Sequence, residues 1–307
     1  MEWKGVMPAM TTAFDENLQV DHGFMTKHAL WLIENGCSGL VMLGSLGEAA
    51  TLTPEEKRAI LKNIRATVPK HVPVVAAISG LSTAEVVALA KTAADSGCDG
   101  LMVLPPYVYQ GDAREMSAHV SAVFRATSLP CMLYNNPVAY GTDFTPPQIH
   151  ELVLEHQNLV AVKESSTDVR RVTGIREVSD DRLSIFVGVD DVIVESIAAG
   201  AVGWIAGLVN ALPKESVALF DYAGSGAKQE AFELYRWFLP LLRMDTVPKF
   251  VQLIKLVQEA VHMGSSRVRP PRLQLAGKEL EQASETIRRA LQARPRVDSD
   301  RLSVASH

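Results

Sequence analysis

Residues 158–166 read Asn-Leu-Val-Ala-Val-Lys-Glu-Ser-Ser. Leu159 to Val162 form an unbroken run of apolar, strand-forming residues, which is typical of a parallel strand buried on both faces. The run ends on Lys163. A lysine held where water is scarce is less inclined to be charged, and it can then attack a carbonyl carbon as a free amine. On this stretch alone, a solvated lysine at a strand end is the simpler interpretation, so the rest of the chain decides.

The same kind of apolar segment recurs along the chain and alternates with stretches of helical periodicity. The predicted strands are Gly5 to Ala9, Gly39 to Leu43, Pro73 to Ala77, Gly100 to Leu104, Pro130 to Tyr134, Leu159 to Val162, Ser184 to Gly188 and Ala201 to Ala206. Eight such alternations suit a closed barrel, because crossover helices join parallel strands. An open doubly wound sheet is the alternative, but no Gly-x-Gly-x-x-Gly motif follows the first strand. The sequence therefore predicts an α/β fold, a (β/α)₈ TIM barrel.

The helix boundaries can also be read. Thr53 and Glu56 form a capping box with Pro54 in the first turn. Gly36 and Gly97 stand just past the last apolar turn of their helices, where a left-handed residue is favoured.

No strand signal follows residue 213, and only helical segments remain. We therefore expect residues 1–224 to form the barrel and residues 225–293 a C-terminal helical appendage. The polar residues 294–307 are expected to be a mobile tail.

Composition limits the kinds of partner. A net charge of -5 gives no basic field for nucleic acid or anionic lipid. Three cysteines, Cys37, Cys98 and Cys131, lack metal-type spacing and are expected to be reduced core residues. No signal peptide or membrane span is evident. We expect a soluble cytoplasmic protein that acts on small molecules.

Polar residues stand where the predicted strands end, which is where barrel enzymes build their active sites. Tyr134 ends the strand before that of Lys163, and a turn from Gly44 to Glu48 follows the second strand. Free N–H groups of a glycine-flanked turn suit a carboxylate, and a tyrosine can pass protons. Together with an amine nucleophile, these groups make a Schiff-base site for a 2-oxo acid.

The nearby acidic residues have simpler interpretations. Glu48 fits an acidic residue in the first turn of a helix, where the helix dipole favours it. Glu164 is expected to be structural. Asp190 and Asp191 fit a helix N-cap at least as well as they fit contacts to a substrate.

Four segments, Gly44 to Leu52, Tyr134 to Pro137, Val162 to Ser166 and Gly188 to Asp191, resemble in order those of one known family. It is the dihydrodipicolinate synthase and N-acetylneuraminate lyase superfamily of class I, Schiff-base aldolases and lyases. The resemblance covers nearly the whole chain. It implies a TIM barrel, no cofactor beyond the lysine imine, and a homotetramer built from tight dimers.

The resemblance also implies site residues. Lys163 would form the imine, Tyr134 would be the proton shuttle, and Ser45 would supply a hydroxyl. The amides of Ser45 and Leu46 would hold the substrate carboxylate. The other substrate-binding candidates are Gly188, Asp190, Tyr107, Tyr109 and Gly207.

Several positions depart from the family pattern. Leu46 stands where the synthases carry a second threonine. Val108 stands where a neighbouring subunit lends a relay tyrosine, which leaves Tyr107 or Tyr109 as substitutes. Ala139 stands where an arginine binds a substrate carboxylate, and an alanine cannot replace that contact. Gly207 replaces the sugar-binding serine of the sialic-acid lyases.

These departures favour dehydration or deamination of a small 2-oxo acid or its cyclic imine, such as a pyrroline-4-hydroxy-2-carboxylate. The alternatives are a pyruvate-dependent aldolase, acting on a 2-keto-3-deoxy acid or as a dihydrodipicolinate synthase, and a non-catalytic barrel that binds a 2-oxo acid. A metal site is not expected, since the histidines fall in predicted helices or loops. A pyridoxal phosphate site is not expected either, since no arginine or serine cluster accompanies the glycines near strand eight.

Overall fold

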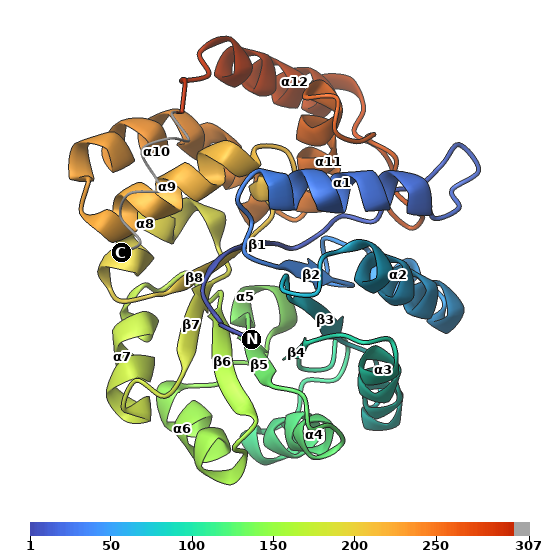
Figure 1. Cartoon of the computed structure of the whole chain (residues 1–307), viewed down its shortest axis with the longest axis vertical. Coiled ribbons are helices and arrows are strands. Elements are labelled where there is room, and N and C mark those ends of the chain that lie inside the picture. Colours follow the sequence, from blue (N-terminus) through green and yellow to red (C-terminus); the bar gives the residue numbers. More distant parts are fainter. Residues whose placement is uncertain (298–307) are drawn as a thin grey trace.

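The computed structural model describes residues 1–297, in which eight parallel strands form a barrel surrounded by helices (Figure 1). The strands are β1 (Gly5–Pro8), β2 (Leu40–Met42), β3 (Val74–Ile78), β4 (Gly100–Val103), β5 (Cys131–Asn135), β6 (Leu159–Glu164), β7 (Ser184–Val187) and β8 (Gly203–Ala206). They pair in the order β1-β8-β7-β6-β5-β4-β3-β2. A parallel bridge between Ala9 and Val41 closes the ring. The predicted strands and the TIM barrel are confirmed.

The barrel helices follow the strands. They are α1 (His22–Glu34), α2 (Pro54–Thr67), α3 (Thr83–Asp95), α4 (Ala113–Arg125), α5 (Pro137–Tyr140), α6 (Pro146–Glu155), α7 (Arg170–Ser179), α8 (Ile193–Ala198) and α9 (Pro213–Ser225), with 3₁₀ turns η1 (Ala49–Thr51), η2 (Asp190–Val192) and η3 (Leu208–Asn210). The capping box of Thr53 and Glu56 is present. Gly36 and Gly97 have φ values of 94° and 82°, as their helix-ending positions require.

The strands are buried because helices cover the outside of the barrel and side chains fill its interior. All five residues of β3 are buried, for example.

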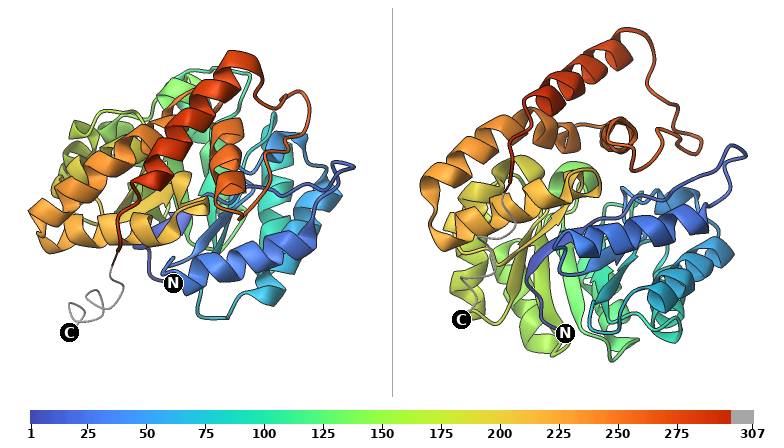
Figure 2. Two further views of the ribbon diagram at one scale, coloured as in Figure 1. Left: turned by 90° about the horizontal axis from the view of Figure 1, so that it is seen from above. Right: turned by 45° about the horizontal axis from the view of Figure 1, so that its top comes forward.

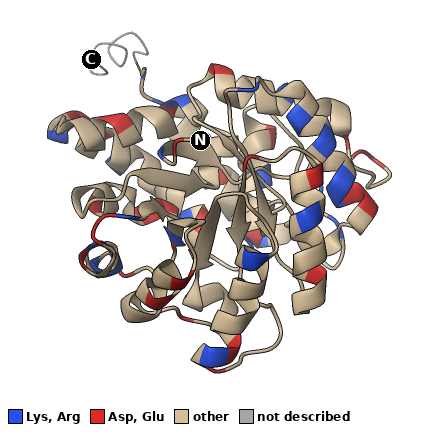
Figure 3. Cartoon of the chain, turned by 60° about the horizontal axis from the view of Figure 1, so that its bottom comes forward, with Lys and Arg blue, Asp and Glu red and all other residues tan. Residues whose placement is uncertain are grey.

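Cys37, Cys98 and Cys131 are buried free thiols, as predicted. None of the described helices has the length and apolar character needed to cross a bilayer. Acidic and basic residues are both scattered over the outer helices (Figure 3).

Three further helices follow the barrel: α10 (Lys228–Leu242), α11 (Phe250–Ala260) and α12 (Gly277–Gln292), with the turn η4 (Arg243–Thr246) between the first two. Figure 2 shows α12 along the outside of this group. Helix α11 contacts η3, and η4 contacts η2, so the group packs against the carboxyl ends of β7 and β8. Of the tail predicted at 294–307, residues 298–307 lie outside the described part of the chain.

A buried ion pair ties this helical group to the barrel. Lys255 Nζ of α11 donates to Glu48 Oε1 over 2.5 Å and to the carbonyl of Arg267 over 2.7 Å. The side chains of Lys255 and Glu48 are 3% and 0% exposed. Burial lowers the pKa of Lys255, and the charge of Glu48 opposes that shift. Glu48 is structural, as expected, but through this long-range pair and not through a helix dipole.

Replacing Lys255 by methionine should cost about 3 kcal/mol of unfolding free energy. The Glu48 carboxylate would stay buried without its lysine, and among residues 1–297 it would keep only the N–H of Arg269 at 3.0 Å and the Arg272 guanidinium at 3.9 Å. Adding Glu48→Gln to Lys255→Met should recover part of that loss. Urea unfolding of the single and double variants measures both effects. Lys249→Met, which breaks an ion pair with side chains 51% and 47% exposed, is the control and should cost less than about 1 kcal/mol. An equally small loss for Lys255→Met would contradict the expectation.

Candidate active site

Lys163 and Tyr134 lie side by side at the carboxyl ends of β6 and β5. The strand register pairs the two residues, and Lys163 Nζ is 4.2 Å from the centre of the Tyr134 ring. Each residue is only 6% exposed. Asn136 Nδ2 donates to the Tyr134 hydroxyl over 3.0 Å. An amine and an oriented phenol therefore share one water-poor place, which suits imine formation and proton transfer.

The turn after β2 can accept an anion. The N–H groups of Ser45 and Leu46 have no backbone carbonyl partner within residues 1–297. No atom outside the chain neighbours lies within 4 Å of where a Cβ on Gly44 would stand, so the space beside the turn is open. A Cβ on Gly47 would lie 2.9 Å from the carbonyl oxygen of Met10, which explains the glycine. Free N–H groups facing open space favour a carboxylate.

Tyr140, which the sequence analysis missed, joins this group. It is the last residue of α5 and is 7% exposed. Its hydroxyl shares a short hydrogen bond with Ser45 Oγ. Its ring meets those of Tyr134 and Tyr107 edge-on, with centroids 5.7 Å and 5.3 Å away. Burial raises the pKa of Tyr140 well above its ordinary value, and the neighbouring tyrosines raise it further.

The two tyrosines of the β4–α4 loop have different positions. Tyr107 packs against Tyr140, and burial raises its pKa, while the hydroxyls of Ser79 and Ser45 oppose the shift. Tyr109 is 57% exposed, and its hydroxyl donates to Glu115 over 3.0 Å. Of the two substitutes considered for the relay tyrosine, Tyr107 lies at the site of its own chain and Tyr109 does not.

Gly188 lies against the Lys163 side chain and against Ser165. A Cβ on Gly188 would lie 1.9 Å from Ser165 Oγ and 2.4 Å from Lys163 Cε, so only glycine fits. Ser165 Oγ is buried and has no hydrogen-bond partner among the described residues. A buried hydroxyl without a partner is costly, which makes this one available to a bound ligand. Its position two residues after Lys163, directly past the end of β6, was the available signal.

Donors of the same chain fill the hydrogen-bonding capacity of the Asp190 carboxylate. The carboxylate accepts hydrogen bonds from Trp204 Nε1 over 3.0 Å and from the N–H groups of Gly207 and Leu208 over 3.2 and 3.0 Å. Burial raises its pKa to about 6 against the effect of these donors. Asp190 thus satisfies the start of η3 and makes no side-chain cap for its own turn η2. The N-cap interpretation is therefore wrong, and the donors leave little of the carboxylate for a substrate.

Asp245, from the turn η4, is the second residue that the sequence analysis missed. A Cβ built on Gly207 would lie 2.1 Å from Asp245 Oδ1 and 3.4 Å from Leu46 Cδ2. The Asp245 side chain therefore takes the space that a serine at position 207 would need. Burial and the charge of Asp190 raise the pKa of Asp245 well above its ordinary value, and the charge of Lys163 opposes them. The helical appendage thus adds a carboxyl group to the barrel mouth.

The Glu164 carboxylate is hydrogen-bonded to Asn135 and Ser166. It accepts from Asn135 Nδ2 over 3.1 Å and from the N–H of Ser166 over 2.6 Å. These bonds hold the segment that follows Lys163, in keeping with the structural expectation.

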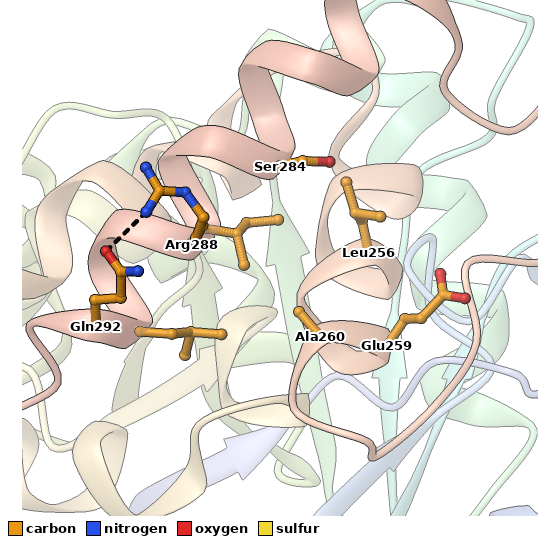
Figure 4. A pocket seen from close by; sticks show the side chains of 8 residues that line it. Leu256, Glu259, Ala260, Ser284, Arg288 and Gln292 are labelled. Carbon is orange, nitrogen blue, oxygen red and sulfur yellow. Dashed lines mark hydrogen bonds between the residues drawn. The ribbon is translucent and has the colours of Figure 1, made fainter.

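Two other kinds of site can be compared with the barrel mouth, namely a metal site and an apolar groove. Within residues 1–297, no three His, Cys, Asp or Glu side chains gather as metal ligands would. A groove of about 490 Å³ lies between α11 and α12 (Figure 4). Leu256, Ala260, Ile287 and Leu291 supply its apolar lining, and it contains no lysine or tyrosine. The reactive groups Lys163 and Tyr134 lie at the barrel mouth and not in this groove.

Comparisons with known proteins point to one family. The family model described as the dihydrodipicolinate synthetase family matches residues 2–290. A 4-hydroxy-tetrahydrodipicolinate synthase of Methanococcus maripaludis is 30% identical over 273 residues, or 89% of this chain and 93% of the relative. The structure of another such synthase, from Methylacidiphilum fumariolicum, has a TM-score of 0.91 at 28% identity and covers 95% of this chain and 97% of its own. A prophage protein of Escherichia coli, solved in complex with pyruvate, has a TM-score of 0.87 at 25% identity, covering 95% of this chain and 99% of its own.

Proposed function

Because the chain belongs to the dihydrodipicolinate synthetase family, whose members are class I Schiff-base lyases and aldolases, we propose that it removes water or ammonia from a small 2-oxo acid or its cyclic imine. Lys163 is the nucleophile, Tyr134 moves protons, and the N–H groups of Ser45 and Leu46 bind the carboxylate. The observation that carries the elimination is the Asp245 carboxyl, which lies half-buried against Gly207 at the barrel mouth and has a raised pKa.

A cyclic pyrroline-4-hydroxy-2-carboxylate illustrates the reaction. Lys163 adds to C2, and the ring nitrogen leaves as an amine, which gives an open-chain lysine imine. Tyr134 accepts a proton from C3, and the C4 hydroxyl leaves as water after it receives a proton. The unsaturated amine then tautomerises to an imine, whose hydrolysis releases ammonia, and hydrolysis of the lysine imine frees the 2-oxo acid.

Asp245 fits the proton donor of this elimination. A carboxyl group with a raised pKa stays protonated nearer neutral pH, and a leaving hydroxyl needs such a donor. Its negative form would also attract the amine released by ring opening. By contrast, a substrate with a second carboxylate would need a cationic contact in the site. The residues present are Asp245 and an exposed Ala139, and neither supplies that contact. Ser165 Oγ, which lacks a partner, is available to bind the substrate near C2.

Product analysis tests this proposal. Purified protein is given the hydroxypyrroline carboxylate and, separately, a 2-keto-3-deoxy acid, and ammonia, dehydrated product and pyruvate are measured. We expect ammonia or a dehydrated 2-oxo acid without pyruvate. Faster release of pyruvate would instead support the aldolase, and pyruvate condensation with an aldehyde would support the synthase activity named for the relatives. Binding without any turnover would support the non-catalytic barrel.

Replacing Asp245 by asparagine should lower kcat for the elimination by about 10²-fold and leave borohydride trapping of the imine intact. In the parent protein the protonated Asp245 is the active form, so kcat should fall as pH rises through its raised pKa. Asp245→Asn should lose this alkaline limb. The measurement is kcat against pH, with Asp221→Asn, at a carboxyl whose pKa is raised by burial alone, as the control. An unchanged kcat and alkaline limb in Asp245→Asn would remove Asp245 from the mechanism.

We further propose a cytoplasmic homotetramer, built as a dimer of dimers. The buried free cysteines suit a reducing compartment. Exposed apolar side chains after β3, β4 and β5, namely Leu81, Val108, Tyr109 and Val138, would be covered by a second copy.

A further inference from the structure

One connected group of hydroxyls leads away from Tyr134. The Tyr140 hydroxyl is hydrogen-bonded to Ser45 Oγ, and its ring meets the Tyr134 ring edge-on, at an interplanar angle of 83°. The Tyr107 ring also packs against Tyr140, with centroids 5.3 Å apart. Contacts within one chain bring Tyr134, Tyr140, Ser45 and Tyr107 together. Val108, which the family resemblance aligns with a tyrosine lent by a neighbour, is 79% exposed and carries no hydroxyl.

The fold holds Tyr140 in place by two local devices. Asn136 caps α5, because its Oδ1 accepts from the N–H of Ala139 over 2.9 Å while its Nδ2 donates to the Tyr134 hydroxyl. Gly141, with φ of 71°, ends the helix directly after Tyr140. The same asparagine thus fixes the Tyr134 hydroxyl and the short helix that carries Tyr140.

We propose that Tyr140 relays protons between Tyr134 and the hydroxyls of Ser45 and Tyr107, so that one chain contains the complete proton path. This inference rests on the Schiff-base function proposed above. When Tyr134 has taken a proton from the substrate, it passes its hydroxyl proton to Tyr140. Tyr140 gives its own proton to Ser45, Ser45 gives its own to Tyr107, and the half-buried Tyr107 releases its own to solvent. Each hydroxyl gains one proton and loses one, so no charge remains on Tyr140.

The surroundings of Tyr140 suit a relay better than a base. Burial keeps its pKa high, so the hydroxyl stays protonated between transfers. In this relay Tyr140 contacts Tyr134 and Ser45 and not the reacting atoms. It is therefore a positioning residue that acts through Tyr134. Its removal should slow proton transfer and leave imine formation in place.

Pyruvate is the probe for the test, because conversion of its lysine imine to an enamine speeds the exchange of its methyl protons with deuterated water. Tyr140→Phe should form the borohydride-trapped adduct on Lys163 as the parent does, while methyl exchange, followed by NMR, slows by about 10²-fold. Tyr222→Phe, on α9 outside this hydroxyl group, is the control and should exchange at the parent rate.

Ser45→Ala breaks the same hydrogen bond from the other side and guards against a folding defect in Tyr140→Phe. If both residues serve one path, the double variant should lose about as much as either single variant and not the product of the two losses. Exchange at the parent rate in Tyr140→Phe, or multiplicative losses in the double variant, would overturn the relay. No adduct and no exchange in the parent would instead overturn the Schiff-base function itself, together with this inference.

Discussion

Replacing Lys163 by methionine should abolish turnover, with a loss of roughly 10⁴-fold or more in kcat/KM, because binding and orientation alone remain once the covalent nucleophile is gone. Methionine keeps most of the volume and apolar contacts of the lysine side chain. The fold should therefore survive, and circular dichroism and urea unfolding check that it does. The measurement is turnover of the best substrate together with borohydride trapping.

The matched control is Lys57→Met, which removes a buried lysine of α2 that is 9% exposed and takes no part in the proposed chemistry. It should keep imine formation and turnover within a few-fold of the parent. If Lys163→Met retains substantial activity, or if both variants lose activity alike, the nucleophile has been assigned to the wrong residue.

Replacing Tyr134 by phenylalanine should reduce kcat by about 10²–10⁴-fold while KM changes little. The ring would still pack beside Lys163, but the hydroxyl that moves protons would be missing and Asn136 would lose its partner. The imine should still form, though slowly. Single-turnover kinetics with borohydride quenching separates the two steps.

The outcome of the Tyr134→Phe experiment separates two interpretations of the phenol. A fall in kcat with an intact imine assigns the hydroxyl to proton transfer after imine formation. Loss of the imine itself, with folding intact, would mean that Tyr134 is needed for nucleophilic attack. Activity within a few-fold of the parent would show that its hydroxyl is dispensable.

The barrel was predictable because its signals are local. Each strand is a short apolar run, and the caps at Thr53, Gly36 and Gly97 are read from adjacent residues. The pairing of Lys163 with Tyr134 followed from the same logic, since consecutive parallel strands end at the same rim. Such patterns need no knowledge of distant contacts.

The parts of the site that were missed depend on distant contacts. Tyr140 reaches Ser45 across 95 positions of sequence, and nothing in a four-residue helix indicates that contact. Asp245 comes from the helical appendage, whose packing over the barrel mouth has no local pattern. Glu48 was assigned to a helix dipole because its partner Lys255 is 207 positions away. Asp190 was misread for the same reason, since its donors lie on and after β8.

The central claim is that Lys163 forms an imine with a 2-oxo acid. Borohydride reduction in the presence of pyruvate and of the hydroxypyrroline carboxylate, followed by peptide mass spectrometry, tests it most directly. The account predicts a reduced adduct on Lys163 and on no other lysine, with the ligand that gives more adduct ranking the substrates. A folded protein that yields no adduct with either ligand, or an adduct on another lysine, would contradict it.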